Sequence, residues 1–238
     1  MSPAQPDGQR TGLLRTGLAS TAFALLGWAG ASWLTEGFQV WTAEGARRHA
    51  VLQAPVPAQP AALRGDGVTG LNLHSLLARP GQATIVSFIY TRCPSVCQAL
   101  GSSFQQLQAA VSTPGLHGGE GGVRLLSISF DPAYDDATQL KSYASLWQAD
   151  ARYWLMAAVP DPGQLQRLLK AWQVVVIADG RGGFEHNAAL LVIDERGRLV
   201  RIFDDNEGPA ALAYARALLR PGRAGALTGM PFALRAPG

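Results

Sequence analysis

Residues 83–111 read ATIVSFIYTRCPSVCQALGSSFQQLQAAV, and this stretch decides the fold. Its first part, Ala83 to Tyr90, is an almost continuous apolar and β-branched run, which is typical of a strand covered on both faces. From Ser95 to Val111 the apolar residues recur at helical spacing. The stretch therefore predicts a buried strand, a turn and a helix, and the chain's two cysteines, Cys93 and Cys97, lie where the strand gives way to the helix.

Strands and helices alternate along the rest of the chain. The patterns predict strands over residues 123–130 and 152–159, helices over residues 136–147, 161–172 and 209–219, and two strands within residues 188–204. Asp161 and Pro162 suit the N-cap and first position of a helix, and Asp135 or Asp136 suits the cap of the preceding one. A short hairpin around Glu195–Gly197 forces an antiparallel pair, so we expect an α/β domain with a mixed sheet flanked by helices. A thioredoxin-like fold has this order of elements.

The N-terminal region contains a segment long enough to cross a bilayer. Leu18 to Leu34 carries no charge, Arg10 and Arg15 precede it, and Glu36 is the first charge beyond it. The positive-inside rule then places the N-terminus in the cytoplasm and the remaining chain outside it. A cleaved signal peptide and a buried core helix are the alternatives to a transmembrane helix. Anchor and signal both export the domain to a compartment where disulfides can form.

Composition shifts predict four parts of the chain. Residues 1–37 form the cytoplasmic N-terminus and anchor, residues 38–60 a linker, residues 61–220 the thioredoxin-like domain, and residues 221–238 an irregular tail. Three prolines between Pro55 and Pro60 favour an extended connection there. The formal charge of +3 comes mostly from scattered arginines, so we expect no nucleic-acid partner.

The cysteine pair admits three interpretations: a structural disulfide, a redox dithiol, or part of a metal site. Helical residues at this spacing lie close enough for a disulfide between Cys93 and Cys97. A disulfide that closes so short a loop stabilises a fold only weakly. The N-terminus of a helix favours a thiolate and lowers the thiol pKa. Thioredoxin-type dithiols have two intervening residues, whereas three separate this pair.

A histidine extends the metal interpretation. His186 lies in the stretch GGFEHNAALLVID, just before a predicted strand, and thioredoxin-type proteins carry a proline in the corresponding stretch. Two thiolates and an imidazole suit copper as Cu(I) or Cu(II), and zinc in a structural site normally recruits four protein ligands. Asp131 and Asp135 either tune such a site electrostatically or have strand-end and capping roles, and we do not expect them to be ligands.

Three segments together resemble the Sco/SenC family of copper-binding assembly proteins for cytochrome c oxidase. They are FIYTRCPSVC, LLSISFDPAYDD and EHNAALLVIDERG, and their order and spacing also fit. The resemblance covers roughly residues 38–219 and implies a thioredoxin-like domain tethered to the outer face of a bacterial inner membrane, in the periplasm. It also implies Cys93, Cys97 and His186 as copper ligands. Ser95, Gln98 and Asn187 differ from residues common in the family.

The resemblance implies a membrane-anchored copper metallochaperone, with no catalytic residue, that passes one copper ion to the copper-bearing subunit of the oxidase. Its Cys93–Cys97 disulfide must be reduced before copper binds, so a thiol reductant is a further expected partner. The alternative is a thiol–disulfide oxidoreductase that acts on the oxidase subunit's cysteines or in oxidative-stress defence. A peroxidase fits the sequence less well. Such enzymes activate their cysteine with nearby Thr and Arg residues, and Thr91 and Arg92 are adjacent to Cys93 but not at the spacing from the cysteine that these enzymes use.

Overall fold

The computed structural model describes residues 7–35, 42–93, 96–113 and 122–220, and the side chains of residues 7–14, 96 and 97 lie outside that description. Contacts divide the chain into two compact units, Met1–His49 and Ala50–Gly238. The first unit contains α1 (Asp7–Leu34), and α2 (Ala43–Gln53) begins in it. Within α1, Arg15–Leu34 is long and apolar enough to be a candidate membrane span, a test that an N-terminal signal sequence also passes.

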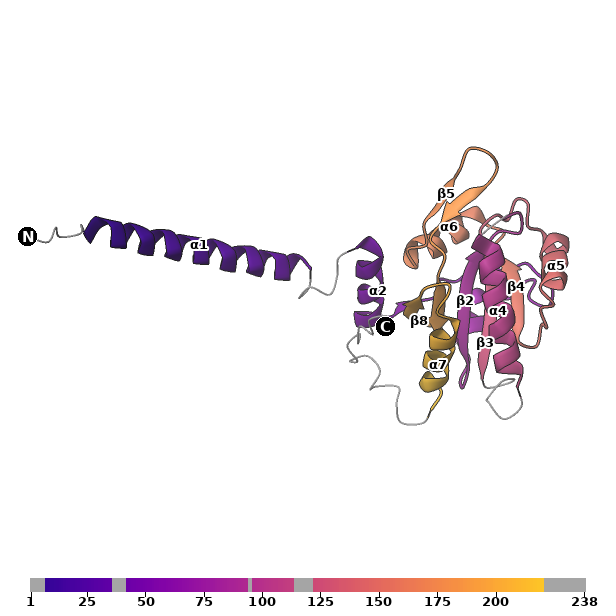
Figure 1. The fold of residues 1–238 in the computed structure, drawn as a ribbon. Helices are drawn as coiled ribbons and strands as arrows, with labels where there is room; N and C mark the ends of the chain where they lie inside the picture. The colour runs from indigo at the N-terminus through magenta and orange to yellow at the C-terminus, as the bar shows by residue number, and fades with distance from the viewer. Residues whose placement is uncertain (1–6, 36–41, 94–95, 114–121, 221–238) are drawn as a thin grey trace, which may run out of the picture. The chain divides into compact units, whose positions relative to one another are not determined.

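The second unit is built on a six-stranded mixed sheet, as predicted (Figure 1). Its strands are β1 (Val56–Pro57), β2 (Ala83–Ile89), β3 (Val123–Ser129), β4 (Trp154–Ala158), β7 (Leu190–Ile193) and β8 (Arg198–Phe203). They lie in the order β1-β8-β7-β2-β3-β4. The pairs β2–β3 and β3–β4 are parallel, whereas β7 is antiparallel to both β2 and β8. The chain therefore runs strand–helix–strand through the centre of the sheet and closes one side with the predicted hairpin.

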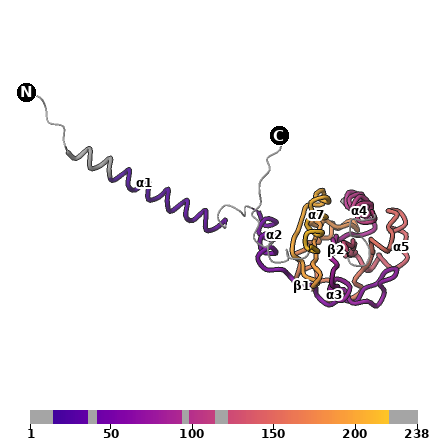
Figure 2. The backbone as a smooth tube through the Cα atoms, turned by 90° about the horizontal axis from the view of Figure 1, so that it is seen from below, coloured from indigo at the N-terminus to yellow at the C-terminus, as the bar shows by residue number. Residues whose placement is uncertain are grey.

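Helices cover both faces of this sheet. They are α3 (Leu73–Leu77), α4 (Val96–Ser112), α5 (Ala137–Leu146), α6 (Pro162–Ala171) and α7 (Gly208–Leu218). Helices α4 and α7 pack side by side on one face, and α3 lies on the opposite side (Figure 2). The structure confirms the four predicted helices α4 to α7, while α2 and α3 were not predicted.

The sequence patterns explain why these elements form where they do. Every residue of β2 is buried, so the apolar run predicted as a doubly covered strand is one. Asp161 caps α6 by accepting a hydrogen bond from the backbone N–H of Gln164 at 2.6 Å, with Pro162 in the first turn. Asp136, rather than Asp135, caps α5 through the N–H of Gln139 at 2.8 Å.

A second, two-stranded sheet lies outside the main one. It consists of β5 (Val176–Ala178) and β6 (Phe184–His186), joined by a turn that contains Gly180, Gly182 and Gly183. Figure 1 shows this hairpin projecting beyond one end of the six-stranded sheet. The sequence predicted no strand over residues 184–186, and His186, expected just before a strand, is instead the last residue of a strand in this separate ribbon.

Candidate functional site

The first candidate ligand, Cys93, follows the carboxyl end of β2. The strand ends at Ile89, and the backbone N–H of Cys93 donates a hydrogen bond to the carbonyl of Tyr90 at 3.2 Å. Cys93 is half-buried and packs against the core. Cys97 is the second residue of α4, and its side chain lies outside the described residues. The sequence prediction of a strand, a turn and a helix around the cysteine pair is thereby confirmed at the level of the backbone.

Asp135 fixes the segment that leads to Cys93. Its fully buried carboxylate accepts hydrogen bonds from the N–H of Thr91 at 3.0 Å and from the Thr91 hydroxyl at 2.5 Å. The hydroxyl of Ser129, the last residue of β3, also donates to it at 2.5 Å. A buried carboxylate with these three donors ties the ends of β2 and β3 together, because a buried polar group that loses a hydrogen bond pays part of its desolvation cost.

Asp131 holds the residue immediately before Cys93. Its carboxylate lies 2.6 Å from an Nη atom of Arg92 and is largely buried, and the Arg92 guanidinium lies over the ring of Tyr134 at 4.3 Å. The sequence left an electrostatic role and a structural role open for Asp131 and Asp135, and their contacts support the structural role. They shape the turn that presents Cys93.

His186 lies at the same end of the sheet as Cys93. Its ring packs edge-on against Phe130 with centroids 5.0 Å apart, and against Tyr90 with centroids 6.5 Å apart. Tyr90 and Phe130 directly follow β2 and β3, so the imidazole lies beside the carboxyl ends of two parallel strands. Burial lowers the pKa of His186, which favours the neutral imidazole that can bind a metal.

A set of three converging ligands is not visible in the part of the chain whose side chains are described. Among those residues no group of three His, Cys, Asp or Glu side chains is arranged to hold a metal ion. Cys97 is outside that set, so the predicted trio of Cys93, Cys97 and His186 stays a prediction. What the structure shows is that the Cys93 turn and the His186 ring both contact Tyr90.

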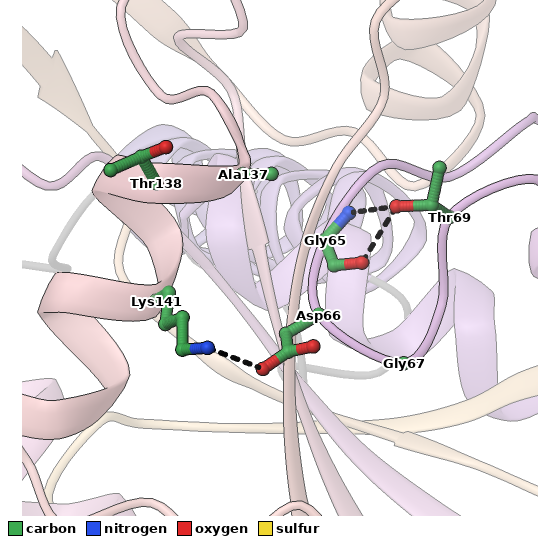
Figure 3. A pocket seen from close by; sticks show the side chains of 7 residues that line it. All are labelled: Gly65, Asp66, Gly67, Thr69, Ala137, Thr138 and Lys141. Carbon is green, nitrogen blue, oxygen red and sulfur yellow. Dashed lines mark hydrogen bonds and ion pairs between the residues drawn. The ribbon is translucent and has the colours of Figure 1, made fainter.

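A surface hollow of about 440 Å³ lies elsewhere, between the 65–69 loop and the start of α5 (Figure 3). Thr69 closes this loop by donating to the carbonyl of Gly65 at 2.7 Å. Lys141 and Asp66 approach to 3.8 Å but are both highly exposed, so their attraction is weakened by solvent. The described side chains that line the hollow include no thiol and no imidazole. The hollow therefore has fewer groups that could bind a soft metal ion than the end of the sheet near Cys93.

Sequence analysis did not single out Tyr90 and gave Asn187 no structural role, although both lie near the site. Tyr90 contacts both the Cys93 turn and the histidine hairpin, and its only signal was a phenol at the end of a buried strand. Asn187 holds the base of the hairpin, because its side chain accepts from the N–H of Val175 at 2.8 Å and donates to the carbonyl of Gln173 at 3.3 Å. At the hairpin tip, the N–H groups of residues 181 and 183 lower the pKa of Asp179.

Comparison with known proteins supports the resemblance. A family model described as SCO1/SenC matches residues 78–218, more than half of the chain. A SCO1 protein homolog of Bacillus subtilis is 22% identical over 135 residues, which covers 56% of this chain and 67% of that protein.

Solved structures share the fold. BsSco, a member of the Sco family of cytochrome c oxidase assembly proteins in which a disulfide switch was identified, is 18% identical with a TM-score of 0.59, over 70% of this chain and 95% of that one. ScoI of Bradyrhizobium japonicum, solved with copper bound, is 23% identical with a TM-score of 0.53, over 67% of this chain and 99% of that one.

Proposed function

Because the chain belongs to the SCO1/SenC family, we propose that it binds one copper ion through Cys93, Cys97 and His186 and delivers it to the copper-bearing subunit of cytochrome c oxidase during assembly. The observation that carries the proposal is the position of His186. Its half-buried ring lies beside Tyr90, and Tyr90 precedes Cys93 by three residues in the sequence. Similar proteins of this fold that were solved with copper bound support copper as the cargo.

The donor set suits copper in both oxidation states. Thiolates are soft ligands that Cu(I) prefers, and Cu(II) accepts imidazole together with thiolate. The environment of His186 favours a neutral ring with a lone pair available for the metal. Transfer then proceeds by ligand exchange: a ligand of the acceptor protein forms a bond to copper as a bond from this chain breaks.

The redox state of the cysteines controls loading. A Cys93–Cys97 disulfide offers no thiolate, so two electrons and two protons must reach it before copper binds. A dithiol reductant supplies them and is itself oxidised to a disulfide. The same pair can serve as a redox centre, and for this reason thiol–disulfide exchange with the oxidase subunit is the competing function.

The proposed location follows from α1. With Arg10 and Arg15 on the cytoplasmic side, the apolar part of α1 spans the bacterial inner membrane once and leaves the family domain facing the periplasm. In this arrangement residues 1–37 are the anchor region, residues 38–60 a linker whose end adds β1 to the sheet, residues 61–220 the copper-binding domain and residues 221–238 a tail. Tethering confines the domain to the membrane that also holds the oxidase.

Anaerobic copper titration of the reduced full chain in detergent tests the proposal. We expect about one copper per chain for the wild type and a loss of affinity for His186→Ala. His74→Ala is the matched control, since His74 is a half-buried histidine in α3, and it should bind as the wild type does. Equal copper affinity in wild type and His186→Ala would remove His186 from the site.

The competing function predicts a different result from the same proteins. A chain that holds no copper, but whose cysteine pair still exchanges with a disulfide substrate in both wild type and His186→Ala, would support an oxidoreductase and contradict the chaperone. Plain dithiol exchange has no requirement for an imidazole ligand, whereas copper retention by the proposed site does.

A further inference from the structure

The backbone of Phe184 faces away from its partner strand. Antiparallel residues alternate between hydrogen-bonded pairs and non-hydrogen-bonded pairs. The N–H of Asp179 donates to the carbonyl of Gly183 at 3.0 Å, so that pair is a bonded one. Phe184 is the next residue along β6 and pairs with Ala178, so its own N–H and C=O point out of the ribbon. On an edge strand these groups need another partner.

Tyr90 supplies that partner. Its hydroxyl oxygen accepts a hydrogen bond from the N–H of Phe184 at 3.3 Å and lies 3.3 Å from the Phe184 carbonyl, to which it donates. Tyr90 is only 3% exposed and Phe184 is half-buried, so this contact is partly shielded from water. The backbone carbonyl of Tyr90 also accepts from the N–H of Cys93 at 3.2 Å. One residue thus bonds to the turn of one candidate ligand and to the strand of the other.

Aromatic packing surrounds these hydrogen bonds. The Tyr90 ring lies edge-on to Phe184, with centroids 5.3 Å apart, and 5.3 Å from Phe130. Phe130 in turn contacts the His186 ring at 5.0 Å. These ring contacts depend on the phenyl group, whereas the bonds to the Phe184 backbone depend on the hydroxyl alone. Replacing Tyr90 by phenylalanine therefore separates positioning by the hydroxyl from packing of the ring.

We propose that Tyr90 is a positioning residue of the copper site: its hydroxyl docks β6 on the end of β2 and so sets the place of the His186 imidazole relative to Cys93. This inference rests on the proposed function, since it takes His186 to be a copper ligand. Phe184 lies two residues before His186 on a strand of only three residues, so fixing its backbone restricts the imidazole directly.

The test uses the reduced full chain in detergent, loaded with one copper ion, and the Tyr90→Phe variant. We expect copper to pass to a competing chelator about two- to twelvefold faster from Tyr90→Phe, the factor that corresponds to one net hydrogen bond. The electron paramagnetic resonance spectrum of the Cu(II) form should change as well, because the geometry of the imidazole changes. Tyr214→Phe is the control, since Tyr214 lies on α7 against Phe203, and it should leave both readouts unchanged.

A double variant decides whether the hydroxyl acts through His186. In the His186→Ala background, Tyr90→Phe should have no further effect on copper release, because the group that it positions is gone. An equal effect in both backgrounds would overturn the inference, as would wild-type release and an unchanged spectrum for Tyr90→Phe. These results leave the proposed function standing, whereas a wild-type chain that holds no copper contradicts the function and the inference together.

Discussion

The Cys93 turn and the histidine hairpin meet at one end of the sheet but are held there in different ways. The turn follows a central strand whose residues are all buried, and Asp135 ties it to β3 through three hydrogen bonds inside the core. The hairpin β5–β6 forms a separate two-stranded sheet, and Ile177 on it and Val175 just before it are more than half exposed. Among the described residues, the hairpin is held by the hydrogen bonds of Tyr90 to Phe184, by the packing of Phe130 against Phe184 and His186, and by the side chain of Asn187.

This difference suits a protein that must both hold a metal and give it up. In the proposed site the cysteine side is built into the folded core, and the histidine side can move without unfolding the sheet. An incoming ligand from an acceptor then displaces the histidine first, at the smaller cost, and transfer is complete when the bonds to Cys93 and Cys97 have been exchanged as well.

Removing the carboxylate of Asp135 should destabilise the whole domain. In Asp135→Ala the buried hydroxyl of Ser129 and the half-buried hydroxyl of Thr91 lose their acceptor, so we expect the free energy of unfolding to fall by about 3 kcal/mol. Urea unfolding of the full chain measures it. Asp136→Ala is the matched control, because this neighbouring carboxylate is exposed and caps α5, and its loss should cost about 1 kcal/mol. Equal losses would show that the Cys93 turn is not tied to the core.

Copper should protect the hairpin more than the sheet. With copper bound through His186, opening of β5–β6 breaks a metal bond. We therefore expect copper to slow hydrogen exchange of the Asp179 amide, which bonds across the ribbon, by about tenfold or more. Hydrogen exchange followed with and without copper under anaerobic conditions measures it. Amides in the centre of β2 report global unfolding and are the internal reference. A hairpin whose exchange copper leaves unchanged would not carry a ligand.

Loosening the base of the hairpin should give a smaller, local effect. Asn187→Ala removes the acceptor for the Val175 N–H and the donor to Gln173, so opening of the ribbon should become easier by about 1 kcal/mol. Exchange at the Asp179 amide reports it, while the urea midpoint should change little. Asn72→Ala removes a comparable side-chain bond, to the N–H of His74 at the start of α3, and should leave hairpin exchange unaltered. If both variants act alike, Asn187 is not specific to the ribbon.

Long, strongly patterned elements were predictable from the sequence alone. The buried run of β2, the capped helix α6 and the turn between β7 and β8 each carry a local signal that their environment does not override. The mixed sheet followed from the hairpin β7–β8. The same reasoning placed Cys93 at a strand end, because the apolar run stops just before it.

The hairpin that carries His186 could not be predicted in the same way. Its strands have three residues each, are partly exposed, and flank a turn rich in glycine, so their local pattern is that of a loop. They form because Tyr90 and Phe130, far away in the sequence, pack against Phe184. The five-residue helix α3 is similarly too short for a periodic signal. Contacts between residues distant in the sequence, and not local propensity, determine where β5, β6 and α3 form.

Pulsed electron paramagnetic resonance on the Cu(II)-loaded full chain tests the central claim most directly. The chain has four histidines, and labelling all of them with ¹⁵N marks any imidazole that binds copper. We predict a ¹⁵N coupling from one histidine in the wild type and in His74→Ala, and its loss in His186→Ala. A coupling that persists in His186→Ala would contradict the account, because another histidine would then bind the metal.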